Sequence, residues 1–340
     1  MIFDLNTLWF VLICILYMVF FILEGFDFGV GMLLPLLGKD DTNRRVIINT
    51  IGPHWDGNEV WLITAGGATF AAFPHWYATM LSGFYLLFFI ILLGLIVRGV
   101  AFEFRGKGQG DRWRKTWDSC IFGGSLIASF SFGVMFSNLV QRLPIDADMI
   151  YKDGIWTLIN PYSICSGLVF IVVFLLHGAV FLSLKTSDGL ADRSSRMAKK
   201  IWIWAVAAYI IFAVMTQIYA EYAIEKRLFL ISMMGLSGLF IIIAGLLNNK
   251  RMNGWAFFMM VLNITLTVAS LFYILYPRVM ISSIDPIYSL TIYNASSSQY
   301  TLQVISIITL IFLPIVVIYQ AWSYYIFRKR VKPDNRDLTY

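Results

Sequence analysis

The chain has 340 residues, of which 59% are hydrophobic and only 14% are charged. A soluble protein carries roughly 25% charged residues and needs them to cover its surface in water. The composition therefore excludes an ordinary soluble domain. The net charge of +6 comes without the long basic, aromatic-rich stretch that nucleic-acid binding requires, so we expect no nucleic-acid partner and a chain solvated mainly by lipid.

Membrane-spanning helices need about 20 mostly apolar residues, and the chain offers several such runs. The first covers residues 5–23; it has no basic stretch before it and continues into further apolar sequence, which predicts a retained span and no cleaved signal peptide. No charged residue occurs from 60 to 97, a run too long for one span, and Phe73-Pro74-His75 predicts a tight turn that divides it. The later predicted spans are 119–141, 161–184, 201–220, 228–247, 255–276 and one within 301–327.

The distribution of basic residues tests this division into nine spans, of which the second has the most polar start. With the N-terminus outside, twenty Lys and Arg fall in the inner connections and the C-terminal tail, and Arg98 also falls on the inner side. Five fall outside, at Arg142, Lys152, Lys226, Arg227 and Arg278. Because basic residues accumulate on the cytoplasmic side, we predict one all-α polytopic membrane domain over 1–340, with the N-terminus outside and the C-terminus cytoplasmic. The outer segment 278–300 is predicted to be an ordered loop.

Four acids in the first two spans are the most informative charges. Glu24 and Asp27 are three residues apart, as are Asp56 and Glu59, so each pair shares one helix face. Counting the rise per residue places both pairs near the cytoplasmic side, with His54 beside them. Ionisable groups are costly in a membrane, and such a group of carboxyls and an imidazole is typical of a proton relay. Capping or headgroup contact explains Glu24 and Asp27 equally well, whereas the deeper Asp56 and Glu59 favour a function.

Cysteine and histidine content limits the redox chemistry of the chain. Cys14, Cys120 and Cys165 each lie in an apolar run and predict neither a disulfide nor a CxxC site. Three histidines cannot ligate several haems, and His177, with no other histidine or acid near it in sequence, is more typical of a core residue than of a haem ligand. A redox centre would therefore need another chain. Six glycines of the first two spans suit close helix packing or irregular backbone: Gly25, Gly29, Gly31, Gly57, Gly66 and Gly67.

Several stretches of the sequence together resemble subunit II of the cytochrome bd-type quinol oxidases. These stretches are EGFDFGVG at 24–31, RRVIINTIGPHWDGNEVWL at 44–62, AAFP at 71–74, Arg98 with FEFR at 102–105, and NASSS at 294–298 followed by Thr301-Leu302. The resemblance covers essentially the full chain, and the 52–62 block is the most specific part. The family often has Gln where this chain has Glu59 and Asp where it has Glu24, so a role for Glu59 would be particular to this variant.

The resemblance implies two four-helix bundles plus one peripheral helix, in a multi-pass protein of the bacterial cytoplasmic membrane. It implies an obligate heterodimer with a subunit I that ligates two b haems and haem d, while this chain ligates no cofactor or metal. The complex would oxidise quinol and reduce oxygen to water. A bound quinone and a small single-span accessory subunit are left open.

Matching positions also suggest roles for individual residues. Asp56 would be the proton-path carboxylate, with His54, Asp27 and Glu24 near its entrance. Trp61 would lie near an oxygen route, an assignment that rests on the resemblance alone.

Two other functions are compatible with the same acids. A proton-coupled secondary transporter is one, although the sequence shows no repeat with paired interrupted helices. A mainly structural chain, in which every acid satisfies local packing, is the other.

Overall fold

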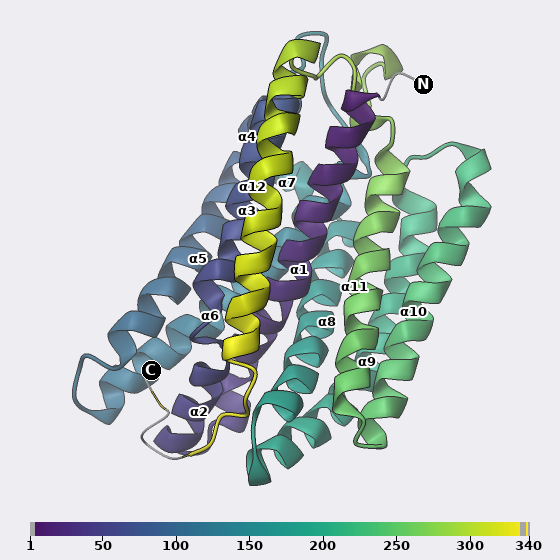
Figure 1. The fold of residues 1–340 in the computed structure, drawn as a ribbon. Coiled ribbons are helices and arrows are strands. Elements are labelled where there is room, and N and C mark those ends of the chain that lie inside the picture. The colour runs from purple at the N-terminus through teal and green to yellow at the C-terminus, as the bar shows by residue number, and fades with distance from the viewer. Residues whose placement is uncertain (1–3, 334–337, 339–340) are drawn as a thin grey trace.

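The computed structural model describes residues 4–333 and residue 338. Long helices run up and down along one common direction (Figure 1). The first half of the chain forms α1 (Leu5–Leu37), α2 (Asp41–Ile51), α3 (Trp55–Ala72), α4 (Pro74–Gly83), α5 (Tyr85–Arg105), α6 (Asp111–Leu139) and α7 (Ile155–Leu158). The second half forms α8 (Pro161–Lys185), α9 (Asp188–Tyr219), α10 (Arg227–Asn249), α11 (Asn253–Leu275) and α12 (Gln299–Ile326).

The long helices form two groups of four. In the first group α1 packs on α3 and α6, and α5 packs on α6; in the second, α8, α9, α10 and α11 pack in chain order and α8 also contacts α11. Contacts of α8 with α1 and α6 join the two groups. Helix α12 lies outside them against α3 and α1, with only 6% of its most apolar stretch buried (Figure 1). The prediction of two bundles plus a peripheral helix is confirmed.

Eight helices of the described chain are long and apolar enough to cross a membrane: α1, α5, α6, α8, α9, α10, α11 and α12. Helix α3, the predicted second span, is not among them, because Asp56, Asn58 and Glu59 together with its glycines and threonines make its 18 residues too polar. The start of α1 and the end of α12 lie at opposite ends of the molecule (Figure 1). A chain whose two ends lie on opposite sides crosses an odd number of times. Eight candidate helices plus α3 would give nine crossings, and this count stays a prediction.

The predicted break at Pro74 is present, with a consequence for the third span. Helix α3 ends at Ala72, Phe73 has φ −133°, and the pyrrolidine ring of Pro74 opens α4 at a position where no amide donor is needed. The ten residues of α4 then precede a kink at Phe84, so α5 starts only at Tyr85. The connection is thus a short helix rather than a tight turn.

A small sheet closes the end of the molecule that is predicted to face outward. Strand β2 (Arg278–Ser282) pairs in parallel with β1 (Arg142–Leu143) and antiparallel with β3 (Leu290–Thr291), and a 3-10 turn (Pro286–Tyr288) lies between β2 and β3. Asn6 Nδ2 at the start of α1 donates to the Ile292 carbonyl at 2.6 Å. The outer segment is therefore an ordered loop, as the sequence predicts.

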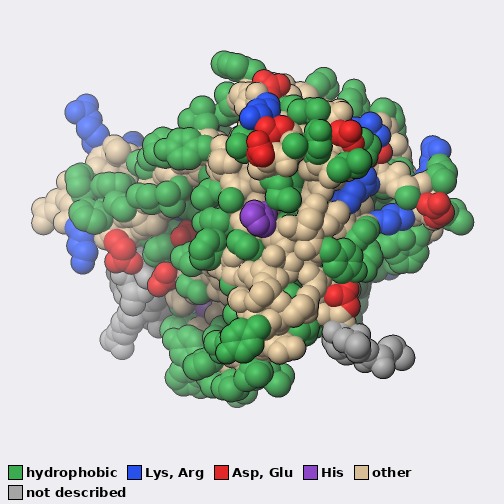
Figure 2. Space-filling view, turned by 90° about the horizontal axis from the view of Figure 1, so that it is seen from above, with side chains coloured by type: hydrophobic (Ala, Val, Ile, Leu, Met, Phe, Trp, Pro, Cys, Tyr) green, Lys and Arg blue, Asp and Glu red, His purple; other side chains and the backbone are tan. Residues whose placement is uncertain are grey.

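Lipid-facing and packed surfaces are clearly separated. Seen from above, hydrophobic side chains occupy much of the rim, and charged side chains lie among them on this end face (Figure 2). Inside, Gly29 of α1 and Gly178 of α8 let two backbones meet: a Cβ on Gly29 would lie 1.9 Å from the Phe174 carbonyl oxygen. A Cβ at Gly66 or Gly67 would meet nothing within 4 Å, so close packing does not account for those two glycines.

Candidate functional site

Arg98 of α5 is the centre of a buried group of charges between α1, α3 and α5. Its Nη1 donates to Oε1 of Glu24 on α1 and, at 2.8 Å, to Oε1 of Glu59 on α3. The side chains of Arg98 and Glu24 are fully buried, and that of Glu59 is 20% exposed. The guanidinium carbon also lies 4.9 Å from the ring centroid of Phe28 and 5.3 Å from that of Phe102. One cation therefore ties three helices together.

Asp27 is the second buried acid of α1, one helical turn beyond Glu24. Asn58 Nδ2 on α3 donates to Asp27 Oδ2 at 2.7 Å. The Asn58 Oδ1 accepts in turn from the Tyr324 hydroxyl at 2.9 Å and from Gln320 Nε2 at 3.0 Å, both on α12. A chain of hydrogen bonds thus runs from the peripheral helix through α3 to the buried carboxyl of α1.

We call Glu24, Asp27, Glu59 and Arg98 the buried acid cluster. Several of its polar atoms have no hydrogen-bond partner among the described residues: Glu24 Oε2, Asp27 Oδ1, and Nε and Nη2 of Arg98. Buried polar atoms normally bind protein groups or ordered water. Each of these atoms is therefore able to bind a water molecule, and the two carboxyl oxygens can also exchange a proton.

His54 lies in the turn before α3, at the end of the molecule that is predicted to face the cytoplasm. Its ring stacks on that of Tyr324, with centroids 4.2 Å apart and planes 2° apart. It is 3% exposed and lines a cavity of about 650 Å³. We call this the cytoplasmic cavity; its other lining residues are Asn49, Thr50, Pro53, Lys185, Ile326, Phe327, Lys329, Arg330, Val331 and Lys332.

Asp56 lies at the rim of the site and not within it. Its side chain is exposed near the start of α3, one turn before Glu59 on the same helix face. Of the four acids that the sequence places near one another, the structure brings Glu24, Asp27 and Glu59 together around one cation and leaves Asp56 at the surface.

Trp61 is buried in the next turn of α3 and faces a different space. It lines an elongated, mostly apolar cavity of about 590 Å³ between α1, α3 and α12. Gly57 and Gly67 of the same helix also line this cavity, so the missing side chain of Gly67 leaves open space there.

Four residues of the site carry no role in the sequence interpretation: Arg98, Asn58, Gln320 and Tyr324. The sequence does contain a sign of the role of Arg98, since it is the only basic residue inside an apolar run. The basic-residue distribution, however, places it simply at the inner end of its span. Asn58 lies between Asp56 and Glu59 in the sequence. Gln320 and Tyr324 are two of several polar positions in a mostly apolar helix, and their partner lies more than 260 positions earlier in the chain.

A second ionic group joins α2, the end of α5 and the start of α6. Arg105 Nε donates to Asp118 at 2.6 Å and its Nη2 to Asp41 at 2.8 Å. Arg114 also pairs with Asp41 at 2.9 Å, and Arg44 with Asp118 at 3.3 Å. Three arginines pair with two carboxylates here, so neither carboxylate lacks a cation and the group clamps the helix ends.

His177 is a core residue of α8. Its Nε2 lies 3.0 Å from the Ile22 carbonyl oxygen, and its ring stacks on Phe257 with centroids 4.7 Å apart. The nitrogen that an axial haem ligand would use is therefore occupied by the backbone of α1. Within the described residues, no group of three or more His, Cys, Asp or Glu is placed to hold a metal ion.

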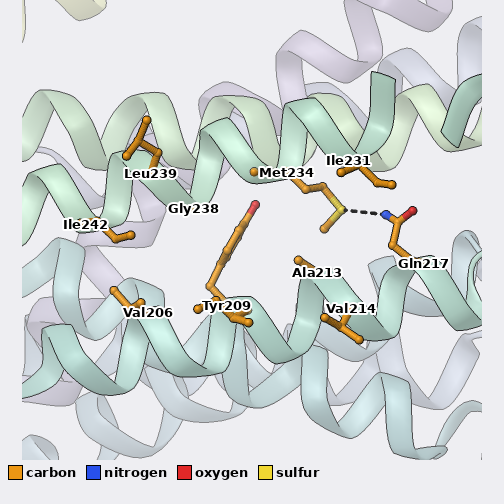
Figure 3. A pocket seen from close by; sticks show the side chains of 12 residues that line it. Val206, Tyr209, Ala213, Val214, Gln217, Ile231, Met234, Gly238, Leu239 and Ile242 are labelled. Carbon is orange, nitrogen blue, oxygen red and sulfur yellow. Dashed lines mark hydrogen bonds between the residues drawn. The ribbon is translucent and has the colours of Figure 1, made fainter. Parts of the chain in front are cut away.

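Another cavity, of about 670 Å³, lies between α9 and α10 (Figure 3). Its polar groups are already bonded: the Tyr209 hydroxyl lies 3.0 Å from Thr267 Oγ1, and Gln217 binds the Tyr222 hydroxyl and the Met234 sulfur. The rest of the lining is apolar. This space suits a lipid acyl chain better than a polar headgroup.

Comparisons of the sequence and the fold with known proteins all lead to one family. Residues 5–327 match the family model of cytochrome bd terminal oxidase subunit II. Cytochrome bd ubiquinol oxidase subunit 2 of Bacillus subtilis is 47% identical over 337 residues, covering 99% of each chain. Cytochrome bd-I ubiquinol oxidase subunit 2 of Escherichia coli K12 is 34% identical, covering 97% of this chain and 96% of that one. In fold, the chain matches the structure of bd oxidase from Geobacillus thermodenitrificans with a TM-score of 0.78 and 17% identity, covering 96% of this chain and 99% of that chain.

Proposed function

This chain belongs to the cytochrome bd terminal oxidase subunit II family, and we propose that within the oxidase it carries protons from the cytoplasm toward subunit I through its buried acid cluster. As a subunit of a quinol:oxygen oxidoreductase it is a multi-pass protein of the bacterial plasma membrane. A solute transporter, the alternative suggested by the same acids, is not favoured by these relatives.

The observation that carries this proposal is the polar chain from the cytoplasmic cavity to the cluster. His54 stacks on Tyr324, the Tyr324 hydroxyl donates to Asn58, and Asn58 donates to Asp27. An amide does not carry protons, so Asn58 positions Asp27. Because Asn58 occupies Asp27 Oδ2, Oδ1 is the oxygen that can take up and release a proton, with water as the bridge.

The charge balance of the cluster fits proton transfer better than a structural role. Arg98 is one cation, and it faces the three carboxyls of Glu24, Asp27 and Glu59. Burying unpaired negative charge is costly, so protons on two of the three carboxyls balance the single cation. The clamp around Arg105 has no such excess of acids, because three arginines pair there with two carboxylates.

We place the exit of this route at the exposed edge of α3. Glu59 is the least buried member of the cluster, and Asp56 lies one turn away on the same face. A proton leaving Glu59 can therefore reach Asp56 at the surface, where a partner subunit can accept it.

Cofactors enter this proposal only through the partner. The family implies a complex that contains haems and a subunit I. We propose that both b haems, haem d and the quinol site lie on subunit I, since His177 offers no free Nε2 to a haem. A quinone bound to this chain and an accessory single-span subunit stay predictions.

We further propose that the apolar cavity beside Trp61 admits oxygen. Oxygen is apolar and partitions into hydrocarbon surroundings, and this cavity borders the lipid-facing helix α12.

Single substitutions in the intact oxidase test the proton route. Asp27→Asn, Glu59→Gln and Asp56→Asn should each lower oxygen consumption about tenfold or more, as expected when a proton-transfer group is removed. The haem absorption spectrum should be unchanged. Glu103→Gln, which removes an exposed acid of α5, is the control and should leave turnover within about twofold. Wild-type turnover in Asp27→Asn would remove the basis of the proposal.

A further inference from the structure

We propose that the cytoplasmic cavity binds the phosphate of an anionic phospholipid. This inference concerns a ligand and does not depend on the proton route, although His54 takes part in both. The shared chemistry is a phosphate anion, and we take a membrane lipid as its source because the cavity lies at the cytoplasmic end of α8 and α12, at the level of the lipid headgroups.

The charges that line the cavity are all positive. Lys185, Lys329, Arg330 and Lys332 line it, and its described lining contains no Asp or Glu. In the part of the chain that the structure describes, none of the last three forms an ion pair. Basic pockets between membrane helices on this side typically bind anionic headgroups.

The segment that carries these cations is fixed by backbone contacts. Lys185 Nζ donates to the carbonyl oxygens of Phe327 and Lys329 at the end of α12. The Val331 amide donates to the Lys185 carbonyl at 2.8 Å, and Arg45 Nη2 donates to the Leu338 carbonyl at 3.0 Å. The chain after α12 is thereby folded back onto α8 and α2, which holds its basic side chains around one space.

Lys185 and the other cations have different tasks. Lys185 already neutralises the carbonyl end of α12, where the helix dipole is negative. The positive charges of Lys329, Arg330 and Lys332 therefore remain for an outside anion.

A buried polar atom in the wall of the cavity is an independent second indication. His54 is 3% exposed, and its Nδ1 has no hydrogen-bond partner among the described residues. The stack on Tyr324 fixes the plane of the imidazole. This nitrogen can donate to a phosphate oxygen, or accept from a hydroxyl of a glycerol headgroup, within the cavity.

Lipid binding to the purified, delipidated oxidase complex tests the site. Native mass spectrometry would follow titration with phosphatidylglycerol, with phosphatidylcholine as the zwitterionic comparison. The triple variant Lys329→Gln/Arg330→Gln/Lys332→Gln should weaken phosphatidylglycerol binding at least about tenfold, because each basic residue near an anionic surface contributes a factor of about five. His54→Phe, which keeps an aromatic ring against Tyr324, should weaken it less.

A charge-matched control is available on the same side of the membrane. Lys199→Gln/Lys200→Gln/Lys250→Gln removes three exposed cations from α9 and the end of α10 and should leave the affinity within about twofold. Equal loss in both triple variants, or equal binding of phosphatidylcholine, would overturn the proposal. Displacement by millimolar inorganic phosphate alone would support a phosphate site and overturn the lipid as its source.

Discussion

At the scale of single residues, Arg98 determines whether the acid cluster can exist at all. Glu24 is completely buried, and its Oε1 accepts a hydrogen bond from Arg98, which is the cation that offsets its charge. Leaving one partner of a buried pair alone costs about 3–5 kcal/mol, whereas removing both costs far less. Replacing Arg98 alone should therefore cost more stability than replacing Arg98 and Glu24 together.

Arg98→Met should accordingly lower the thermal stability and the yield of the assembled oxidase, by an amount equivalent to about 3–5 kcal/mol. Adding Glu24→Gln to that variant should recover part of the loss, because the buried carboxylate is gone. Thermal unfolding of the purified complex is the measurement. A double variant less stable than Arg98→Met would contradict this pairing.

Helical periodicity alone predicted which acids share a face, and it located Glu24, Asp27 and Glu59 correctly near one another. It did not predict that Asp56 is exposed, because the exposed edge of α3 depends on where α5 and α12 pack. Nor did it reveal Tyr324 as a partner of Asn58, since that contact depends on the position of a helix at the other end of the chain.

At the scale of elements, the crossing of α1 over α8 sets the position of the acids. Gly29 follows Asp27 by two residues, and its Cα faces Gly178 so closely that no side chain fits between the backbones. Backbone atoms cannot move aside as a flexible side chain can. The glycine pair therefore fixes the height and rotation of α1 and with it the position of both acids.

Gly29→Ala should destabilise the complex by about 1–3 kcal/mol through overpacking and should lower turnover by displacing Asp27. Gly123→Ala on α6 is the matched control, because a Cβ there meets nothing within 4 Å. Melting temperature and oxygen consumption are read together. Equal effects of the two alanines would show that the close crossing has no special importance.

At the scale of the whole molecule, the open question is how the chain crosses the membrane. Hydropathy and the basic-residue distribution predicted the architecture well, because lipid imposes long apolar helices whatever the tertiary contacts are. The ninth crossing is harder to predict, since α3 carries the polar residues of the site and so lacks the composition of a span.

Cysteine labelling in whole cells decides the topology. In a background with Cys14, Cys120 and Cys165 replaced, His75→Cys and Trp156→Cys should react with a membrane-impermeant maleimide from outside, since both positions are exposed. Lys115→Cys should react only after the membrane is opened. Labelling of His75→Cys from inside alone would mean that α3 does not cross.

The most direct test of proton delivery through the cluster is the rate of proton uptake after an oxygen pulse. The fully reduced oxidase is mixed with oxygen beside a pH indicator on its cytoplasmic side, and uptake is timed against haem oxidation. Asp27→Asn should slow proton uptake about tenfold or more, while oxygen binding to the reduced oxidase keeps its rate. Proton uptake at the wild-type rate in that variant would contradict the account.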